Sequence, residues 1–227
     1  MSRFSPFIRT VRWLCLLLPI ALFGCLHGPK HYRIKIESQI VQPLSHTFAV
    51  AVDWSAVRAR RGITTFPNGG LPHVIAHEAR IYRVNVNTNT IEMIARLEDY
   101  GGIAAPQSIE LHQWHRDGIY FTIRGYGERA GGRGDDTKAP REVHFRVPKS
   151  GELIRLDQPP DQSALHNAPS EDKKWAHPGL YLRGTSEEIV IQIDDWSLEP
   201  ERIAFLRFSK ATGAPYLIHK TFSSEDQ

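Results

Sequence analysis

The stretch RIYRVNVNTNTIEMIARL, residues 80–97, alternates apolar and polar side chains on both sides of a polar turn. Alternation at every second residue is typical of a β-strand with one buried face. Asn87 and Asn89 tolerate the left-handed backbone that hairpin turns often require. The stretch therefore predicts a β-hairpin.

Two later stretches have the same pattern: EVHFRVPKSGELIRLD, residues 142–157, and RIAFLRFSKATGAPYLIHKTF, residues 202–222. Their turns are predicted at Lys149-Ser150-Gly151 and at Thr212-Gly213. Another β-rich pair precedes each hairpin: HYRIKIESQ (31–39) with TFAVAVDWS (47–55), SIELHQWHRDGIYFTIRG (108–125), and GLYLRGTSEEIVIQIDDWS (179–197). The tripeptide Asp53-Trp54-Ser55 even recurs as Asp195-Trp196-Ser197, after strands that we expect to be equivalent. The chain is therefore predicted to be all-β, with three repeated four-stranded antiparallel units.

The hairpin at residues 81–97 resembles the closing half of a β-propeller blade of the TolB or WD40 type, and WHRDGIYFTI, residues 114–123, resembles another element of such blades. This resemblance implies a propeller-like fold. Propellers normally close with four to eight blades, so three units cannot complete a ring alone. Three arrangements remain open: two chains that share a six-bladed ring as a homodimer, an open partial propeller, and a β-sandwich or barrel.

The first 24 residues carry Arg3, Arg9 and Arg12 and no acidic residue, and they end in the apolar run WLCLLLPIALFG. This run is shorter than the roughly 20 residues of a membrane-spanning helix and contains Pro19. It is typical of a cleaved export signal. Leu22-Phe23-Gly24-Cys25 resembles the lipobox of bacterial lipoproteins, which implies cleavage before Cys25 and attachment of lipid to that cysteine. Within the same resemblance, Leu26 implies transport to the outer membrane, where the domain faces the periplasm.

These observations divide the chain into a signal peptide (1–24), a lipidated cysteine with a short tether (25–30), one all-β repeat domain (31–222) and a frayed tail (223–227). The signal would remove three of the 28 basic residues and none of the 25 acidic ones, which leaves a formally neutral domain. No cluster of Lys and Arg with interleaved aromatic residues follows, so nucleic-acid binding has little support. Cys15 and Cys25 are the two cysteines, and the folded part therefore has no free thiol.

Two inserts interrupt the units, at residues 56–79 and 126–140, and we expect binding residues on such loops. Arg58, Arg60 and Arg61 form a cationic stretch in the first insert that could face lipid phosphates, lipopolysaccharide or an acidic partner. Further candidates for partner binding are Arg129, Arg133, Asp135 and Asp136 in the second insert, and Trp175 in a polar linker.

Metal binding has weak candidates only. His73 and His77 are four residues apart, which suits a shared ion on a helix but separates them by roughly 13 Å on a strand. His112 and His115 differ by an odd number, so a regular strand without a bulge sends them to opposite faces. His115 and Asp117 are expected on one face near a turn. The sequence also lacks nucleophile and phosphate-loop motifs, so we predict no cofactor and no catalysis.

We therefore expect an outer-membrane lipoprotein that binds another protein in the periplasm, as an envelope scaffold or as an immunity protein against a delivered toxin. The alternative is a periplasmic enzyme, or a receptor for a small ligand or metal, whose site lies in a central cavity. Asp135-Asp136 and Asp194-Asp195 are two pairs of aspartates. A deep pocket lined by two or more of His73, His112, His115 and these paired aspartates would favour that alternative, whereas a flat or loop-rimmed face would favour protein binding.

Overall fold

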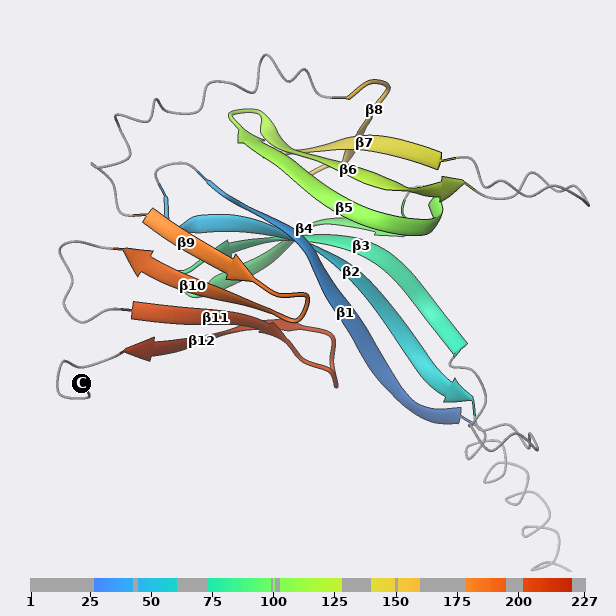
Figure 1. Ribbon diagram of the computed structural model, residues 1–227, viewed down its shortest axis with the longest axis horizontal. Coiled ribbons are helices and arrows are strands. Elements are labelled where there is room, and N and C mark those ends of the chain that lie inside the picture. The colour runs from blue at the N-terminus through green and yellow to red at the C-terminus, as the bar shows by residue number, and fades with distance from the viewer. Residues whose placement is uncertain are drawn as a thin grey trace, which may run out of the picture.

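The computed structural model describes residues 27–42, 45–60, 73–98, 100, 103–127, 140–149, 151–159, 179–194 and 202–221. These residues form twelve strands in three antiparallel sheets of four strands each (Figure 1). The predicted all-β class and the three four-stranded units are confirmed. In the described part of the chain there is no helix that is long and apolar enough to cross a membrane.

The three sheets follow one another along the chain. The first sheet contains β1 (His27–Val41), β2 (Thr47–Arg60), β3 (His73–Asn85) and β4 (Thr90–Glu98), in that order. The second sheet contains β5 (Ile103–His115), β6 (Gly118–Gly127), β7 (Pro140–Pro148) and β8 (Ile154–Leu156). The third sheet contains β9 (Gly179–Gly184), β10 (Glu188–Asp194), β11 (Arg202–Phe208) and β12 (Pro215–Thr221).

The turns of the three hairpins lie where the sequence predicts them. Asn89 has a φ of 53° between β3 and β4, and Gly213 has a φ of 72° between β11 and β12. Gly151 has a φ of 87° after β7, and its N–H donates to the Pro148 carbonyl at 2.9 Å. These positions adopt the left-handed backbone that Asn and Gly accommodate more easily than other residues.

The first sheet lies between the other two, although it comes first in the chain (Figure 1). Alternate residues of β2 enter two separate cores. Phe48, Val50 and Val52 pack toward the third sheet, where Ile189, Ile191 and Leu206 complete the core. Ala49 and Ala51 belong to the other core, with Ile109, Phe121 and Ile123 of the second sheet. A strand buried on both faces has to be apolar at consecutive positions, which explains FAVAV at residues 48–52.

Several sequence-based boundaries need correction. β2 continues to Arg60 and β3 starts at His73, so much of the predicted insert at residues 56–79 is strand rather than loop. Asp53-Trp54-Ser55 lies inside β2 and not after it, while its second copy lies outside the described residues. β1 starts at His27, four residues before the predicted start of the domain.

The structure describes only some of the predicted site residues. Arg58 is exposed on β2, and Arg60 and His73 are placed in β2 and β3 by their backbone alone. The remaining candidates lie outside the described residues: Cys25, Arg61, Arg129, Arg133, Asp135, Asp136 and Trp175. The signal peptide and the tail at 223–227 lie outside them too.

Candidate functional site: a groove between β1 and the third sheet

β1 is an edge strand of the first sheet, and its outer edge is covered by turns from the third sheet. The N–H of Tyr32 donates to the Lys210 carbonyl at 3.2 Å, and the N–H of Ile36 donates to the Ser186 carbonyl at 2.8 Å. Lys210 lies in the β11–β12 turn and Ser186 in the β9–β10 turn. An uncovered edge invites pairing with other strands, so these two turns protect the first sheet.

The other half of β1 is covered by the second sheet through one serine. A β-bulge between Ile36 and Ser38 shifts the register of β1. Beyond it, the Ser38 hydroxyl donates to the Ile109 carbonyl at 2.8 Å and accepts from the Leu111 N–H at 2.9 Å. A side chain thus replaces the backbone ladder between β1 and β5.

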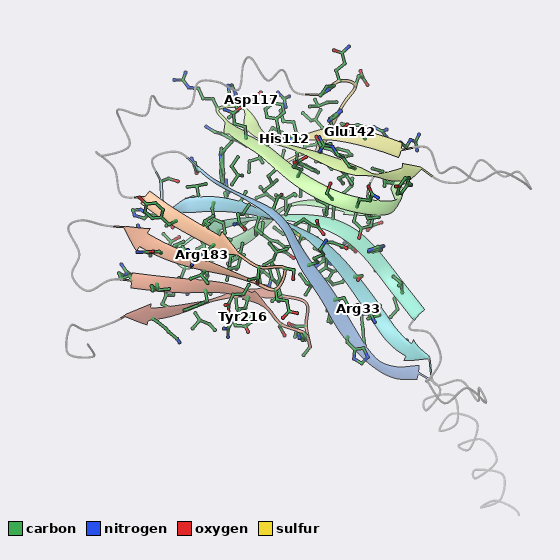
Figure 2. The ribbon with its side chains drawn as sticks, viewed as in Figure 1. Arg33, His112, Asp117, Glu142, Arg183 and Tyr216 are labelled. Atoms are coloured by element: carbon green, nitrogen blue, oxygen red, sulfur yellow. The ribbon has the colours of Figure 1, made fainter. Side chains whose placement is uncertain are left out.

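A groove of about 1020 Å³ lies between β1 and the turns of the third sheet. β1 contributes Tyr32, Arg33 and Ile34 to its lining. The third sheet contributes polar and aromatic residues: Thr185, Glu187, Glu188, Arg207, Phe208, Ser209, Lys210, Ala211 and Tyr216. Figure 2 shows Tyr216 on the third sheet and Arg33 on the neighbouring part of β1.

The backbone of Ile34 faces this groove. In an antiparallel strand every second residue directs its N–H and C=O to the same side. Because the N–H groups of Tyr32 and Ile36 point to the third sheet, and the register between them is regular, those of Ile34 point there too. No described residue accepts the Ile34 N–H. With respect to the described residues, the groove therefore offers the Ile34 N–H as a free donor and the Ile34 carbonyl as a free acceptor.

The side chains around the groove carry both signs of charge. Glu188 forms an ion pair with Arg207. Within the described ranges, the side chains of Arg33, Lys210 and Glu187 have no ion-pair partner. Tyr216 is 42% exposed, which leaves its ring available for contact. Such a lining suits a peptide better than a purely apolar molecule.

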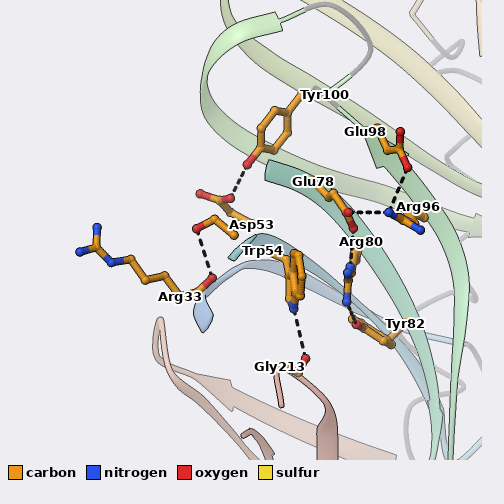
Figure 3. A network of polar contacts seen from close by, with 11 residues as sticks. Arg33, Asp53, Trp54, Glu78, Arg80, Tyr82, Arg96, Glu98, Tyr100 and Gly213 are labelled. Carbon is orange, nitrogen blue, oxygen red and sulfur yellow. Dashed lines mark hydrogen bonds and ion pairs between the residues drawn. The ribbon is translucent and has the colours of Figure 1, made fainter. Parts of the chain in front are cut away.

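Next to the groove, a cluster of side chains around Trp54 holds the β11–β12 turn against the first sheet (Figure 3). The indole Nε1 of Trp54 donates to the Gly213 carbonyl at 3.2 Å, and the Tyr32 and Trp54 ring centroids are 5.2 Å apart. The Arg80 guanidinium lies 3.4 Å from the centroid of the Trp54 ring. A Cβ on Gly213 would lie 2.7 Å from Trp54 Nε1, so glycine is required for this approach.

Glu78 positions Arg80 in this cluster. The Glu78 carboxylate is 2% exposed and accepts from Arg80 Nε at 2.8 Å and from Arg96 at 2.7 Å. Burial alone would raise the pKa of Glu78, but the hydrogen bonds from Arg96 and Arg80 outweigh it and lower that pKa. Glu78 therefore stays charged and keeps Arg80 in place over Trp54.

The opposite face of the first sheet holds a second polar cluster, which contains His77. His77 Nε2 lies 3.2 Å from Asp53, and the Tyr100 hydroxyl donates to the same carboxylate. Burial, followed by the hydrogen bond to Asp53, raises the pKa of Tyr100, so its hydroxyl remains a donor. His73 and His77 both lie on β3, where the strand spacing separates them by roughly 13 Å. They do not form the helical pair that would share an ion.

His115 and Asp117 do come together, as their spacing predicts. His115 Nδ1 lies 2.8 Å from Asp117 Oδ1, while Tyr120 and Arg146 each donate to Oδ2 at 2.7 Å. Burial opposes the charged form, but these three hydrogen bonds outweigh it and lower the pKa of Asp117 to about 2. The cluster ties β5, β6 and β7 together near the β5–β6 turn, which is a structural role.

A histidine pair on the second sheet was not expected from the sequence. His112 occupies a β-bulge, and its Nε2 lies 2.6 Å from the Thr122 hydroxyl, which is 2.9 Å from His144 Nδ1. His112 and His115 therefore have different partners. Among the residues that the structure describes, no three or more His, Cys, Asp or Glu side chains gather in a way that could hold a metal ion.

The groove itself was missed by sequence reasoning, which placed binding residues on the inserts. Its walls come from segments about 150 residues apart in the chain, at Tyr32 to Ile34 and at Thr185 to Tyr216. No local motif marks such a site. The only local signal is Gly213, whose turn the sequence does predict.

The chain matches no protein-family model, and comparison with curated proteins and with solved structures found no similar protein.

Proposed function

We propose that this protein is a lipid-anchored protein of the outer membrane that faces the periplasm and binds a segment of another protein in the groove between β1 and the third sheet. The groove is the observation that carries this proposal. An extended segment that crosses the edge of β1 can donate to the Ile34 carbonyl and accept from its N–H, as in other cases of recognition by strand edges. Tyr216 would supply an aromatic contact.

The lining favours a protein partner over the alternative of a small ligand or a metal. The groove lies at the rim between two sheets and not in a central cavity, and no described lining residue is a histidine or an aspartate. Arg33, Lys210 and Glu187 have no ion-pair partner in the described part of the chain, and they can form ion pairs with a partner that carries both signs of charge. An envelope scaffold and an immunity protein that blocks a toxin both need such a surface.

Site-specific crosslinking in cells tests the binding proposal. A photoreactive phenylalanine analogue replaces Tyr216 in the groove or, as the control, Tyr181, which is 60% exposed on β9 outside the groove. We expect position 216 to give an adduct with one envelope protein and position 181 to give none. Lys210→Glu should reduce the adduct about tenfold. Equal adducts at both positions, or none at position 216, would contradict the proposal.

Lipid attachment is tested separately. Cells that are grown with labelled palmitate should incorporate the label into the wild-type protein and not into Cys25→Ser, and the variant should leave the outer-membrane fraction. A wild-type protein that takes up no label is not anchored in this way, whatever the crosslinking shows.

A further inference from the structure

The first sheet extends past the point where its fourth strand stops. β4 pairs with β3 only as far as Glu78, whereas β1, β2 and β3 continue together toward His27, Arg60 and His73. We call this three-stranded extension, residues 27–33, 55–60 and 73–77, the arm. In Figure 1 the arm projects away from the other two sheets.

The arm is cationic, although the chain after residue 24 is formally neutral. Its three segments contain Lys30, Arg33, Arg58 and Arg60 and no aspartate or glutamate. Lys30 and Arg58 are exposed, and Lys30 lies 5.1 Å from the centroid of the Tyr32 ring. A concentration of one sign of charge at one end of a neutral domain favours an anionic surface as its partner.

The arm also exposes two adjacent aliphatic residues. Val74 is 48% exposed and Ile75 is 44% exposed. Successive residues of a regular strand face opposite sides, but a β-bulge at Ile75 interrupts the pairing of β3 with β2. Val74 pairs with Val57, whereas Lys30 pairs with Arg58, so Val74 lies on the face opposite the two cations. The aliphatic and basic side chains therefore border the end of the arm from its two faces.

The position of the arm in the chain indicates what covers it. Cys25 precedes His27, the first residue of the arm, by two residues, and two extended residues span about 7 Å. A lipid on Cys25 would hold the arm against the membrane, because no long tether separates them.

We propose that the end of the arm lies on the membrane surface, with Lys30 and Arg58 against the phosphates of anionic lipids and Val74 and Ile75 at the boundary between headgroups and acyl chains. Surface segments with basic and aliphatic side chains bind anionic bilayers in this way. This inference rests on the proposed acylation of Cys25. It adds an orientation, because the arm then fixes which side of the domain faces the bilayer.

Fluorescence quenching by lipid measures this contact on the full lipidated protein. Ile75→Cys carries an environment-sensitive label, and Tyr181→Cys on the third sheet serves as the control. Both proteins are reconstituted in vesicles of phosphatidylcholine alone, or with added phosphatidylglycerol, that contain lipids with brominated acyl chains. We expect the label at position 75 to be quenched in the anionic vesicles and the label at position 181 to be unaffected.

Reversal of the arm's charge provides the second variant. In the Ile75→Cys protein, Lys30→Glu with Arg58→Glu should lower the quenching at least fivefold, since each basic residue near an anionic surface changes binding by about that factor. Circular dichroism checks that the variant keeps its β-structure, and Lys30→Gln with Arg58→Gln in the same Ile75→Cys protein should give an intermediate value.

The outcomes separate this inference from the proposed function. A protein whose mass lacks acyl chains, and which does not sediment with vesicles, contradicts the lipid anchor. An acylated, vesicle-bound protein with equal signals at positions 75 and 181 overturns the arm contact alone. Self-quenching at position 75 that grows with protein concentration would assign the arm to a second copy of the chain and would also overturn the proposal.

Discussion

Glu78 shows how one buried carboxylate supports the contact between the first sheet and the β11–β12 turn. It is held by two arginines from the same face of the first sheet, and one of them, Arg80, stacks on Trp54. A buried charge that loses its partner is strongly unfavourable. The effect of Glu78 on stability should therefore exceed that of any exposed acid in the same sheet.

Glu78→Ala should lower the free energy of unfolding by about 3 kcal/mol, because it leaves Arg80 without a counter-charge. Glu98→Ala is the matched control, since Glu98 also pairs with Arg96, at 2.9 Å, but its side chain is 71% exposed. Glu98→Ala should cost about 0.5 kcal/mol or less. Urea unfolding measures both values, and equal losses would show that burial of Glu78 is unimportant.

His112 gives the molecule a dependence on pH. Burial, the largest cause, lowers its pKa below the ordinary value of 6.5. The unfolded chain therefore binds a proton at a higher pH than the folded chain does, and stability should fall as the pH drops below about 6.5. His112→Gln should flatten the fall in melting temperature between about pH 7 and pH 5. His31→Gln, at an exposed position on β1, should retain the wild-type slope.

At the level of single residues, sequence spacing predicts contacts within an element but not between elements. The contact of His115 with Asp117 follows from two positions on one face near a turn. The ion pair of Glu78 with Arg96 depends on the register of β3 against β4. The hydrogen bonds that join His112, Thr122 and His144 depend on the registers of three strands and on a bulge. These registers are set by packing across the sheets and not by neighbours in the chain.

Among the elements, β1 depends most on its neighbours, because its edge is covered by turns and by a single serine. The β11–β12 turn approaches so closely that Gly213 contacts both Trp54 and Tyr32. The turn after β7 has the same backbone requirement without any such contact, since no atom lies within 4 Å of a Cβ on Gly151. Substitutions at these two glycines can therefore be compared to separate the cost of a positive φ from the cost of steric crowding.

Gly213→Ala should destabilise the protein by about 1 to 3 kcal/mol more than Gly151→Ala does. Both substitutions place alanine at a positive φ, so this contribution is shared. Only Gly213→Ala displaces the turn from β1 and opens the groove. Thermal unfolding of the two variants measures the difference. Equal melting temperatures would mean that the β11–β12 turn moves away from β1 without loss of stability.

The three hairpins were predicted because their signals are local: alternating strands and a turn with Asn or Gly. The arm was not, because the basic residues after Val57 and the glycines at 69–70 indicate a loop. Yet Arg58 and Arg60 are separated by one small residue, as in an exposed strand. A strand with a solvated face keeps its alternation even where its residues are charged.

In the whole molecule, the first sheet belongs to two cores, which should make unfolding cooperative. Ile191 in the core with the third sheet and Ile123 in the core with the second sheet are both fully buried. We expect Ile191→Ala and Ile123→Ala each to lower the free energy of unfolding by about 2 to 5 kcal/mol and to leave one transition. Circular dichroism and tryptophan fluorescence should give the same midpoint. A second transition in Ile191→Ala alone would mean that the third sheet unfolds separately.

The repeated sequence pattern does not predict the order of the three sheets in space. Three similar units predict three sheets, but similarity does not say which sheet lies between the others. The consecutive apolar residues of β2 indicate a strand with two buried faces, and this pattern singles out the first unit. The groove depends on that order, because it forms where the third sheet returns to β1.

The return of the third sheet to β1 has a consequence for biosynthesis. The middle layer of the molecule is synthesised first and one of its outer layers last, with Gly179–Thr221 supplying the cover for Phe48, Val50 and Val52. Until that final segment has been synthesised, this apolar face of the first sheet remains exposed to water and to other chains. Folding of this protein should therefore need protection by a chaperone for as long as synthesis is unfinished, and products that stop short of Gly179 should be cleared by proteases.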